Sequence, residues 1–142
     1  MNYGWIFYAL LSAVAASFVA IFGKIGLANV DSTLATSVRA IVMAVFLFLI
    51  AFFLGKFENY QSISGKAFIF IVLSGVAGAL SWLAYFYAIK IAPADKIPSV
   101  ASLDKLSVVM VFIFSLIFLG SKFSLKASIG AVLISLGAIL MI

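Results

Sequence analysis

The sequence predicts an all-α integral membrane protein with five transmembrane helices. Hydrophobic residues make up 67% of the 142 residues and charged residues only 9%, which is too little polar surface for the water-exposed shell of a soluble domain. The apolar residues form five long stretches, and most charged residues lie at the ends of these stretches. Because lipid cannot satisfy open backbone groups, such stretches cross a bilayer as helices.

The five stretches cover residues 5–23, 34–54, 67–89, 97–119 and 125–142. Their lengths are close to the ~20 residues that a hydrocarbon core of ~30 Å requires. We expect them to form a single membrane domain over residues 1–142, with the N- and C-termini on opposite sides because the number of spans is odd. No positive residue precedes the first stretch, so we expect a span there and not a cleaved signal peptide.

The residues between the stretches are typical of helix ends. Asp31 is a candidate N-cap for the second span, Ser62 and Ser64 for the third, and Ser124 for the fifth. Pro98 fits the first turn of the fourth span.

The composition argues against an enzyme. The chain has no Cys and no His, which excludes thiolate chemistry and removes the commonest metal ligand. It contains no phosphate-binding loop, no metal-ligand cluster and no nucleophile–base pair, so we expect no catalytic residue, metal or cofactor. The net charge of +5 comes from lysines spread singly over several turns. We therefore expect lipid, and no nucleic acid, among the partners.

The positive charges are almost evenly divided between the two sides of the membrane. One side would carry Lys56, Lys66, Lys122 and Lys126, and the other Lys24, Lys90 and Lys96. The positive-inside rule therefore selects no orientation. We favour dual topology, in which copies insert both ways and pair as an antiparallel homodimer; the alternative is a small bias that the insertion machinery still resolves.

A faint internal repeat supports a two-hairpin organisation. Residues 24–39 resemble residues 90–105 at an offset of 66 residues. Common descent and shared turn chemistry account for this similarity equally well.

Three charged residues lie well inside apolar sequence, where a charge costs at least ~2.5–3.5 kcal/mol. They are Arg39, Asp104 and Lys105. Arg39 and Asp104 each lie about 9 Å past the start of their helix, so we expect an ion pair, which either fixes helix packing or leaves Asp104 to contact a cation or proton. Lys105 lies about 100° around the helix from Asp104. We therefore expect it on another face, either snorkelling or meeting an anionic group.

Candidate pathway residues surround these charges. Ser107 shares a helical stripe with Asp104, and Ser81, Trp82 and Tyr85 lie in the middle of the third span. With Gly75 and Gly78 on the same helix, the aromatic residues could line a cavity. The alternative is tight packing in which an aromatic ring fills a gap.

Small residues in the last span predict close helix contacts. Gly130, Ala131 and Gly137 recur at spacings that let two helix backbones approach. Gly75 and Gly78 of the third span are further candidates for such contacts. For both spans, the sequence does not decide whether the contact is within a protomer or between protomers.

Several segments resemble the EamA family of the drug/metabolite transporter superfamily. They are Ala35-Thr36-Ser37-Val38-Arg39, Ser81-Trp82-Leu83-Ala84-Tyr85-Phe86, Asp104-Lys105-Leu106-Ser107 and Phe118-Leu119-Gly120. The similarity is greatest to the short, single-repeat bacterial and archaeal members. It implies one five-helix transporter repeat in a prokaryotic cytoplasmic (inner) membrane, a small-molecule substrate and an inverted-repeat architecture.

Two positions depart from the family pattern. Ser121 stands where the family usually has Glu, and Ser102 stands where it often has Pro. The second departure predicts a straighter fourth span.

Together these features predict a transporter of a small organic metabolite or drug-like solute, working by alternating access as an antiparallel homodimer. The alternatives are a non-transporting membrane subunit, a partner in a heterodimer and a lipid flippase.

Overall fold

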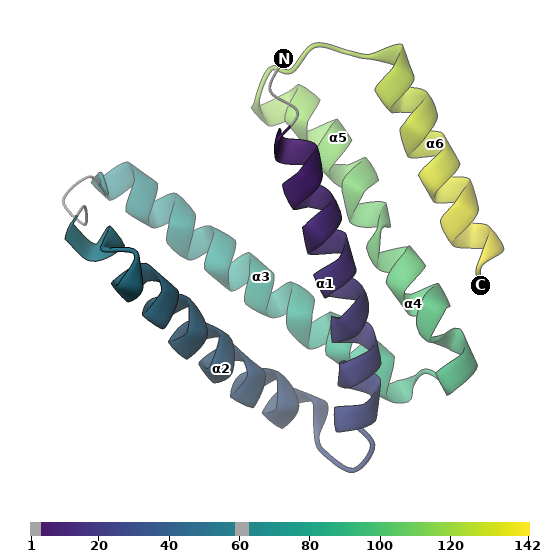
Figure 1. Ribbon diagram of the computed structural model, residues 1–142. Coiled ribbons are helices and arrows are strands. Elements are labelled where there is room, and N and C mark those ends of the chain that lie inside the picture. Colours follow the sequence, from purple (N-terminus) through teal and green to yellow (C-terminus); the bar gives the residue numbers. More distant parts are fainter. Residues whose placement is uncertain (1–3, 59–62) are drawn as a thin grey trace. The chain divides into compact units, whose positions relative to one another are not determined.

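The computed structural model describes residues 4–58 and 63–142, which form helices joined by short turns (Figure 1). The elements are α1 (Gly4–Gly26), α2 (Ser32–Phe53), α3 (Gly65–Ile91), the short 3-10 helix η2 (Ala94–Lys96), α4 (Ile97–Asp104), α5 (Leu106–Phe118) and α6 (Leu125–Leu140). Helices α1, α2, α3 and the stretch Ala94–Phe118 are long and apolar enough to cross a membrane, and α6 is a shorter apolar helix. The predicted all-α membrane fold is confirmed.

The helix ends depend on the capping residues expected from the sequence. The Asp31 carboxylate accepts hydrogen bonds from the amides of Thr33 (2.9 Å) and Leu34 (3.0 Å) at the start of α2. The Ser64 and Ser124 hydroxyls accept from amides in the first turns of α3 and α6. Ser62, the other candidate cap of α3, lies outside the described residues.

The fourth span is not the continuous helix that was predicted, because it is interrupted at Lys105. The Lys105 amide donates to the Ser102 carbonyl and the Val108 amide to the Lys105 carbonyl, each three residues back instead of four. The Ser102 hydroxyl donates to the Ser99 carbonyl at 2.8 Å. A side chain that bonds to its own helix in this way competes with the backbone ladder and favours a local distortion. This span is therefore not a regular helix, although Ser102 stands where the family often has proline.

The chain forms two compact units, and each is described by itself. The first unit comprises Met1–Lys24 and Ile91–Ile142. In it, α6 packs along both α4 and α5 (Figure 1), and the Ser99 hydroxyl at the start of α4 donates to the Met141 carbonyl. The second unit is Ile25–Lys90. The single domain expected over residues 1–142 stays a prediction.

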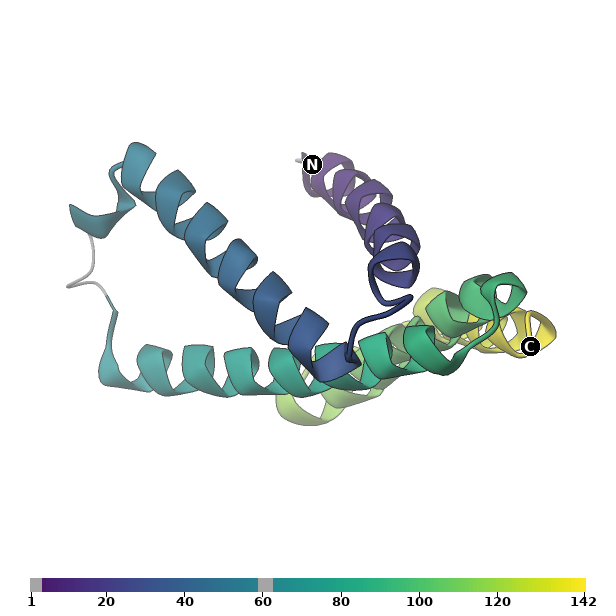
Figure 2. The same cartoon turned by 90° about the horizontal axis from the view of Figure 1, so that it is seen from below.

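The second unit is a hairpin of α2 and α3. The two helices lie closest where α2 begins and α3 ends, and they diverge toward the turn that joins them (Figure 2). At the close end, Lys90 Nζ donates to the Val30 carbonyl at 2.8 Å. At the other end, Gly55 follows α2 with a φ of +64°, a left-handed conformation that favours glycine.

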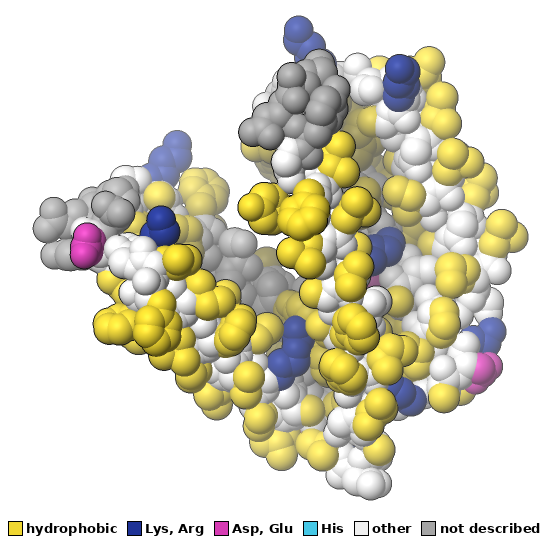
Figure 3. All heavy atoms as spheres, viewed as in Figure 1, with side chains coloured by type: hydrophobic (Ala, Val, Ile, Leu, Met, Phe, Trp, Pro, Cys, Tyr) yellow, Lys and Arg dark blue, Asp and Glu magenta, His cyan; other side chains and the backbone are white. Residues whose placement is uncertain are grey.

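Large apolar side chains cover the outside of both units. Hydrophobic groups dominate the face shown in Figure 3, and charged side chains are few on it. The most enclosed large side chain of the described residues is Ile89, at 0% exposure, whereas Phe53 and Leu119 are each 80% exposed. Such a surface suits a bilayer, in which lipid solvates the apolar side chains.

Candidate functional site

A cleft of about 360 Å³ lies between α2 and α3, within the second unit. Residues of α2 that line it are Thr36, Ser37, Arg39, Ala40 and Met43. Residues of α3 that line it are Gly75, Gly78, Ala79, Trp82 and Leu83. The residues from each helix recur every three or four positions, so each set forms one face of its helix. This volume falls within the range of small-molecule sites, about 300–1,000 Å³.

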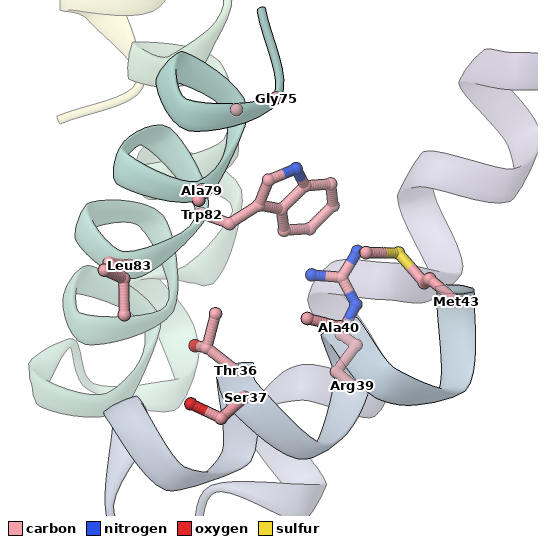
Figure 4. Close-up of a pocket in the computed structure, with 10 residues that line it drawn as sticks. Thr36, Ser37, Arg39, Ala40, Met43, Gly75, Ala79, Trp82 and Leu83 are labelled. Carbon is pink, nitrogen blue, oxygen red and sulfur yellow. The ribbon is translucent and has the colours of Figure 1, made fainter. Parts of the chain in front are cut away.

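The guanidinium of Arg39 stacks on aromatic rings of α3. Its Cζ atom lies 3.3 Å from the ring centroid of Trp82 and 4.7 Å from that of Phe86. Figure 4 shows the indole of Trp82 reaching from α3 toward the Arg39 head group on α2. The negative faces of the two rings attract the cation and hold the planar group in one orientation. Phe86 is itself only 4% exposed, so one of the two rings that contact the cation is buried.

Stacking leaves the edges of the guanidinium for hydrogen bonds, and one of those edges is unused. The Nη2 atom faces the Met43 sulfur at 3.6 Å, which is a weak acceptor. The Nη1 atom is buried and has no hydrogen-bond partner among the residues that the structure describes. A buried donor in this state costs free energy. Arg39 therefore offers a charged donor at the cleft that the described chain does not satisfy.

The hydroxyl groups beside Arg39 are already engaged with the backbone of α2. Thr36 donates to the Ser32 carbonyl at 2.7 Å, and Ser37 donates to the Thr33 carbonyl at 2.9 Å. Their protons are thus turned toward the helix. Of the ten residues that line the cleft, Arg39 alone is charged, so the cleft carries one positive charge.

The other aromatic and serine candidates of α3 lie next to the cleft. The half-buried ring of Tyr85 meets Trp82 edge-on, with 6.2 Å between the ring centroids, and Phe86 at 6.1 Å. Tyr85 therefore packs against both rings that contact Arg39. Ser81 is exposed and is not among the lining residues.

Asp104, Lys105 and Ser107 belong to the first unit, at the interruption between α4 and α5. Lys105 Nζ lies 3.2 Å from Asp104 Oδ2. The long lysine side chain thus meets the carboxylate of its own neighbour, although consecutive residues project about 100° apart on a helix. That the two residues belong to different faces of the span stays a prediction. Ser107 is exposed on α5. Since Arg39 and Asp104 lie in different units, their pairing stays a prediction.

The candidate packing glycines have open space beside them. A Cβ added at Gly75, Gly78, Gly130 or Gly137 would meet no described heavy atom within 4 Å. Gly75 and Gly78 instead give the cleft its room on the α3 side. On α6, Ala131 is half-buried on the same face as Ser135 and the buried Ala138. A contact of these glycines with a second copy stays a prediction.

Sequence reasoning missed Thr36, Met43 and Phe86 as neighbours of the charged group. Thr36 and Met43 lie three and four residues from Arg39 and so share its helix face. Phe86 lies four residues after Trp82 in the same way. Counting in helical steps from the one intramembrane arginine would have found these residues, but which helix faces Arg39 depends on the packing.

Comparisons with known proteins agree with a transporter. The model of the EamA-like transporter family matches residues 3–142. A Sinorhizobium protein described as "Uncharacterized transporter in cobO 3'region" is 42% identical over 141 residues, which is 99% of this chain and 98% of the relative. No solved structure matches the chain.

Proposed function

This chain belongs to the EamA-like transporter family, and we propose that it carries a small organic solute across a prokaryotic cytoplasmic membrane as an antiparallel homodimer. The solute occupies the cleft between α2 and α3. Alternating access comes from rocking two oppositely inserted copies about their shared site.

The observation that carries this proposal is the cleft itself. It combines a mostly apolar lining with one fixed charged group, Arg39 held on Trp82. Pockets for small molecules have this character, since apolar contacts supply affinity and a few polar groups supply orientation. An arginine within an apolar span is costly and marks a pathway by default.

The proposal of an antiparallel homodimer is supported by the size of the repeat and by the charge distribution of the chain. A single repeat of this size supplies half of an inverted-repeat transporter, and the lysines of this chain are nearly balanced between the two sides. A second copy in the opposite orientation supplies the missing half without a second gene product.

The test is whether water reaches the cleft. The chain has no Cys, so a single Ala79→Cys replacement places one thiol in the lining. Ala77→Cys is the matched control, because two residues turn about 200° around a helix and Ala77 is exposed on the opposite face of α3. We expect a charged, water-soluble methanethiosulfonate reagent to modify Ala79→Cys in membranes and to spare Ala77→Cys.

Modification of the Ala79→Cys protein should also block entry of solute into proteoliposomes. A cleft thiol that stays unmodified while a thiol in the α1–α2 turn (Asn29→Cys) reacts would show a dry, purely structural interface. That result would replace the transporter proposal with a structural subunit.

A further inference from the structure

We infer that the transported solute is a small organic anion, and that its carboxylate or similar anionic group binds the unsatisfied Nη1 edge of Arg39. This inference rests on the proposed function, because it names the substrate class of the same cleft. The negative charge of the solute is an additional claim, and it can prove wrong while the proposal of transport stands.

The first argument is the state of the guanidinium. Nη1 is buried and has no partner in the described chain, while Trp82 and Phe86 occupy the face of the group. A stacked guanidinium can still form in-plane hydrogen bonds, and a carboxylate matches that edge with charge-assisted bonds. The unsatisfied Nη1 edge of Arg39 therefore suits a planar anionic group.

The second argument is the charge of the lining. Arg39 is the one charged residue among the ten that form the cleft, and the Thr36 and Ser37 protons are already donated to the backbone. A cationic solute would meet an uncompensated like charge in a poorly screened environment. A neutral solute would leave the Arg39 charge uncompensated, whereas an anion compensates it.

The third argument is size. The cleft measures about 360 Å³ and its remaining walls are mainly small or aliphatic, with Ala40, Ala79 and Leu83 among them. These walls favour a compact apolar body attached to the anionic group. An anionic lipid headgroup and the chain's own Asp104 carboxylate offer the same anionic chemistry, and the experiment separates them from a soluble solute.

The experiment uses three probes of similar size and different charge: benzoate, the neutral benzamide and the cationic benzylamine. The chain has two tryptophans, so Trp5→Phe leaves Trp82 as the sole indole and its emission reports occupancy of the cleft. We expect saturable quenching by benzoate at neutral pH, at least about tenfold tighter than by benzamide, and no saturable response to benzylamine.

Variants of Arg39 and a matched lysine connect this preference to one side chain. Arg39→Gln should remove the preference of benzoate over benzamide, and Arg39→Lys should keep part of it, because the charge remains but the planar edge is lost. Lys126→Gln, which removes a charge on exposed α6 surface, should leave it unchanged. Equal affinities for benzoate and benzamide, or an unchanged preference in a monodisperse Arg39→Gln protein, overturns the inference.

Two further arms identify the source of the anion. Benzoate binding should be the same in phosphatidylcholine nanodiscs with and without phosphatidylglycerol, whereas displacement by phosphatidylglycerol assigns the site to a lipid headgroup. Benzoate affinity should also be unchanged by Asp104→Asn. If benzoate binds only to that variant, Asp104 is the partner of Arg39 in the unmodified protein and excludes benzoate. Either of these two results would overturn the inference that the bound anion is a soluble solute.

The two proposals can fail separately. If a thiol reagent reaches Ala79→Cys but the protein shows no preference for the anionic probe, only this inference is refuted, whereas a cleft that no reagent reaches refutes both proposals.

Discussion

Arg39 keeps its charge inside an apolar helix because two aromatic rings offset part of the cost. An intramembrane charge costs at least ~2.5–3.5 kcal/mol, and a desolvated cation–π contact returns about 2 kcal/mol or more. Trp82 and Phe86 both contact the guanidinium, but its buried Nη1 has no described partner. That unsatisfied donor is the place where a bound anion would add a further favourable interaction.

Asp31 shows a second way in which one side chain sets local structure. The amide of Leu34, helped by the amide of Thr33 and the positive charge of Lys90, holds the pKa of the Asp31 carboxyl below its usual value of 3.8. A carboxylate with a depressed folded pKa stabilises the fold above its usual pKa. That stabilisation is lost as the pH falls through the folded value.

We therefore expect Asp31→Ala to lower the thermal unfolding midpoint in detergent at neutral pH by roughly a few degrees. The difference from the natural protein should shrink once the pH is below 3.8. Asp31→Asn is the control, because asparagine caps a helix without a titrating charge. A difference between the natural protein and Asp31→Ala that is constant from neutral to strongly acid pH would contradict this account.

The fourth span shows how short-range hydrogen bonds shape an element. Ser102 bonds to the Ser99 carbonyl, and the backbone tightens at Lys105, which divides the span into α4 and α5. The same region brings Lys105 onto Asp104. Interrupted helices are common near transporter sites, since they present polar backbone and side chains at membrane depth.

The end of α5 provides a test of element boundaries. Gly120 follows the helix with a φ of +59°, and Gly120→Ala should destabilise the protein by about 1–2 kcal/mol because a Cβ disfavours that conformation. Gly137→Ala, in the interior of α6 with open space beside it, should be neutral or slightly stabilising. Denaturant unfolding of the two variants in detergent measures the difference. Equal effects would show that Gly120 does not end the helix.

The molecule as a whole has a nearly balanced distribution of positive charge, and orientation is its most informative property. Asn29→Cys and Glu58→Cys place exposed thiols before and after α2, on opposite sides of the membrane. With dual topology, an impermeant thiol reagent applied to intact cells should label each site in about half of the molecules. Full labelling of one site and none of the other would point to an oppositely oriented partner chain.

Orientation should also respond to single charges. Asn29→Lys should move the population toward copies that keep the α1–α2 turn in the cytoplasm, and Glu58→Lys should move it the other way. The same labelling at a thiol elsewhere in each turn measures the shift. An orientation that ignores both changes would mean that features other than loop charge decide insertion.

Several properties followed from the amino-acid sequence alone. The all-α class, the approximate spans, the caps Asp31, Ser64 and Ser124, and the identity of the charges inside the spans all depend on local composition. Lipid enforces helices and restricts charges to the ends, so these properties need no knowledge of packing. The EamA resemblance, carried by short segments such as Ala35-Thr36-Ser37-Val38-Arg39, was confirmed by the family match.

Tertiary structure decided which residues meet. Lipid-facing and protein-facing side chains are both apolar in a membrane helix, so the sequence does not reveal which face of α3 turns toward Arg39. Only the packing of α2 on α3 placed the guanidinium on Trp82 and Phe86 and left the buried Nη1 without a hydrogen-bond partner in the described chain. Likewise, only the three-dimensional backbone showed the interruption at Lys105, because it arises from competition between side-chain and main-chain hydrogen bonds that a hydropathy pattern does not record.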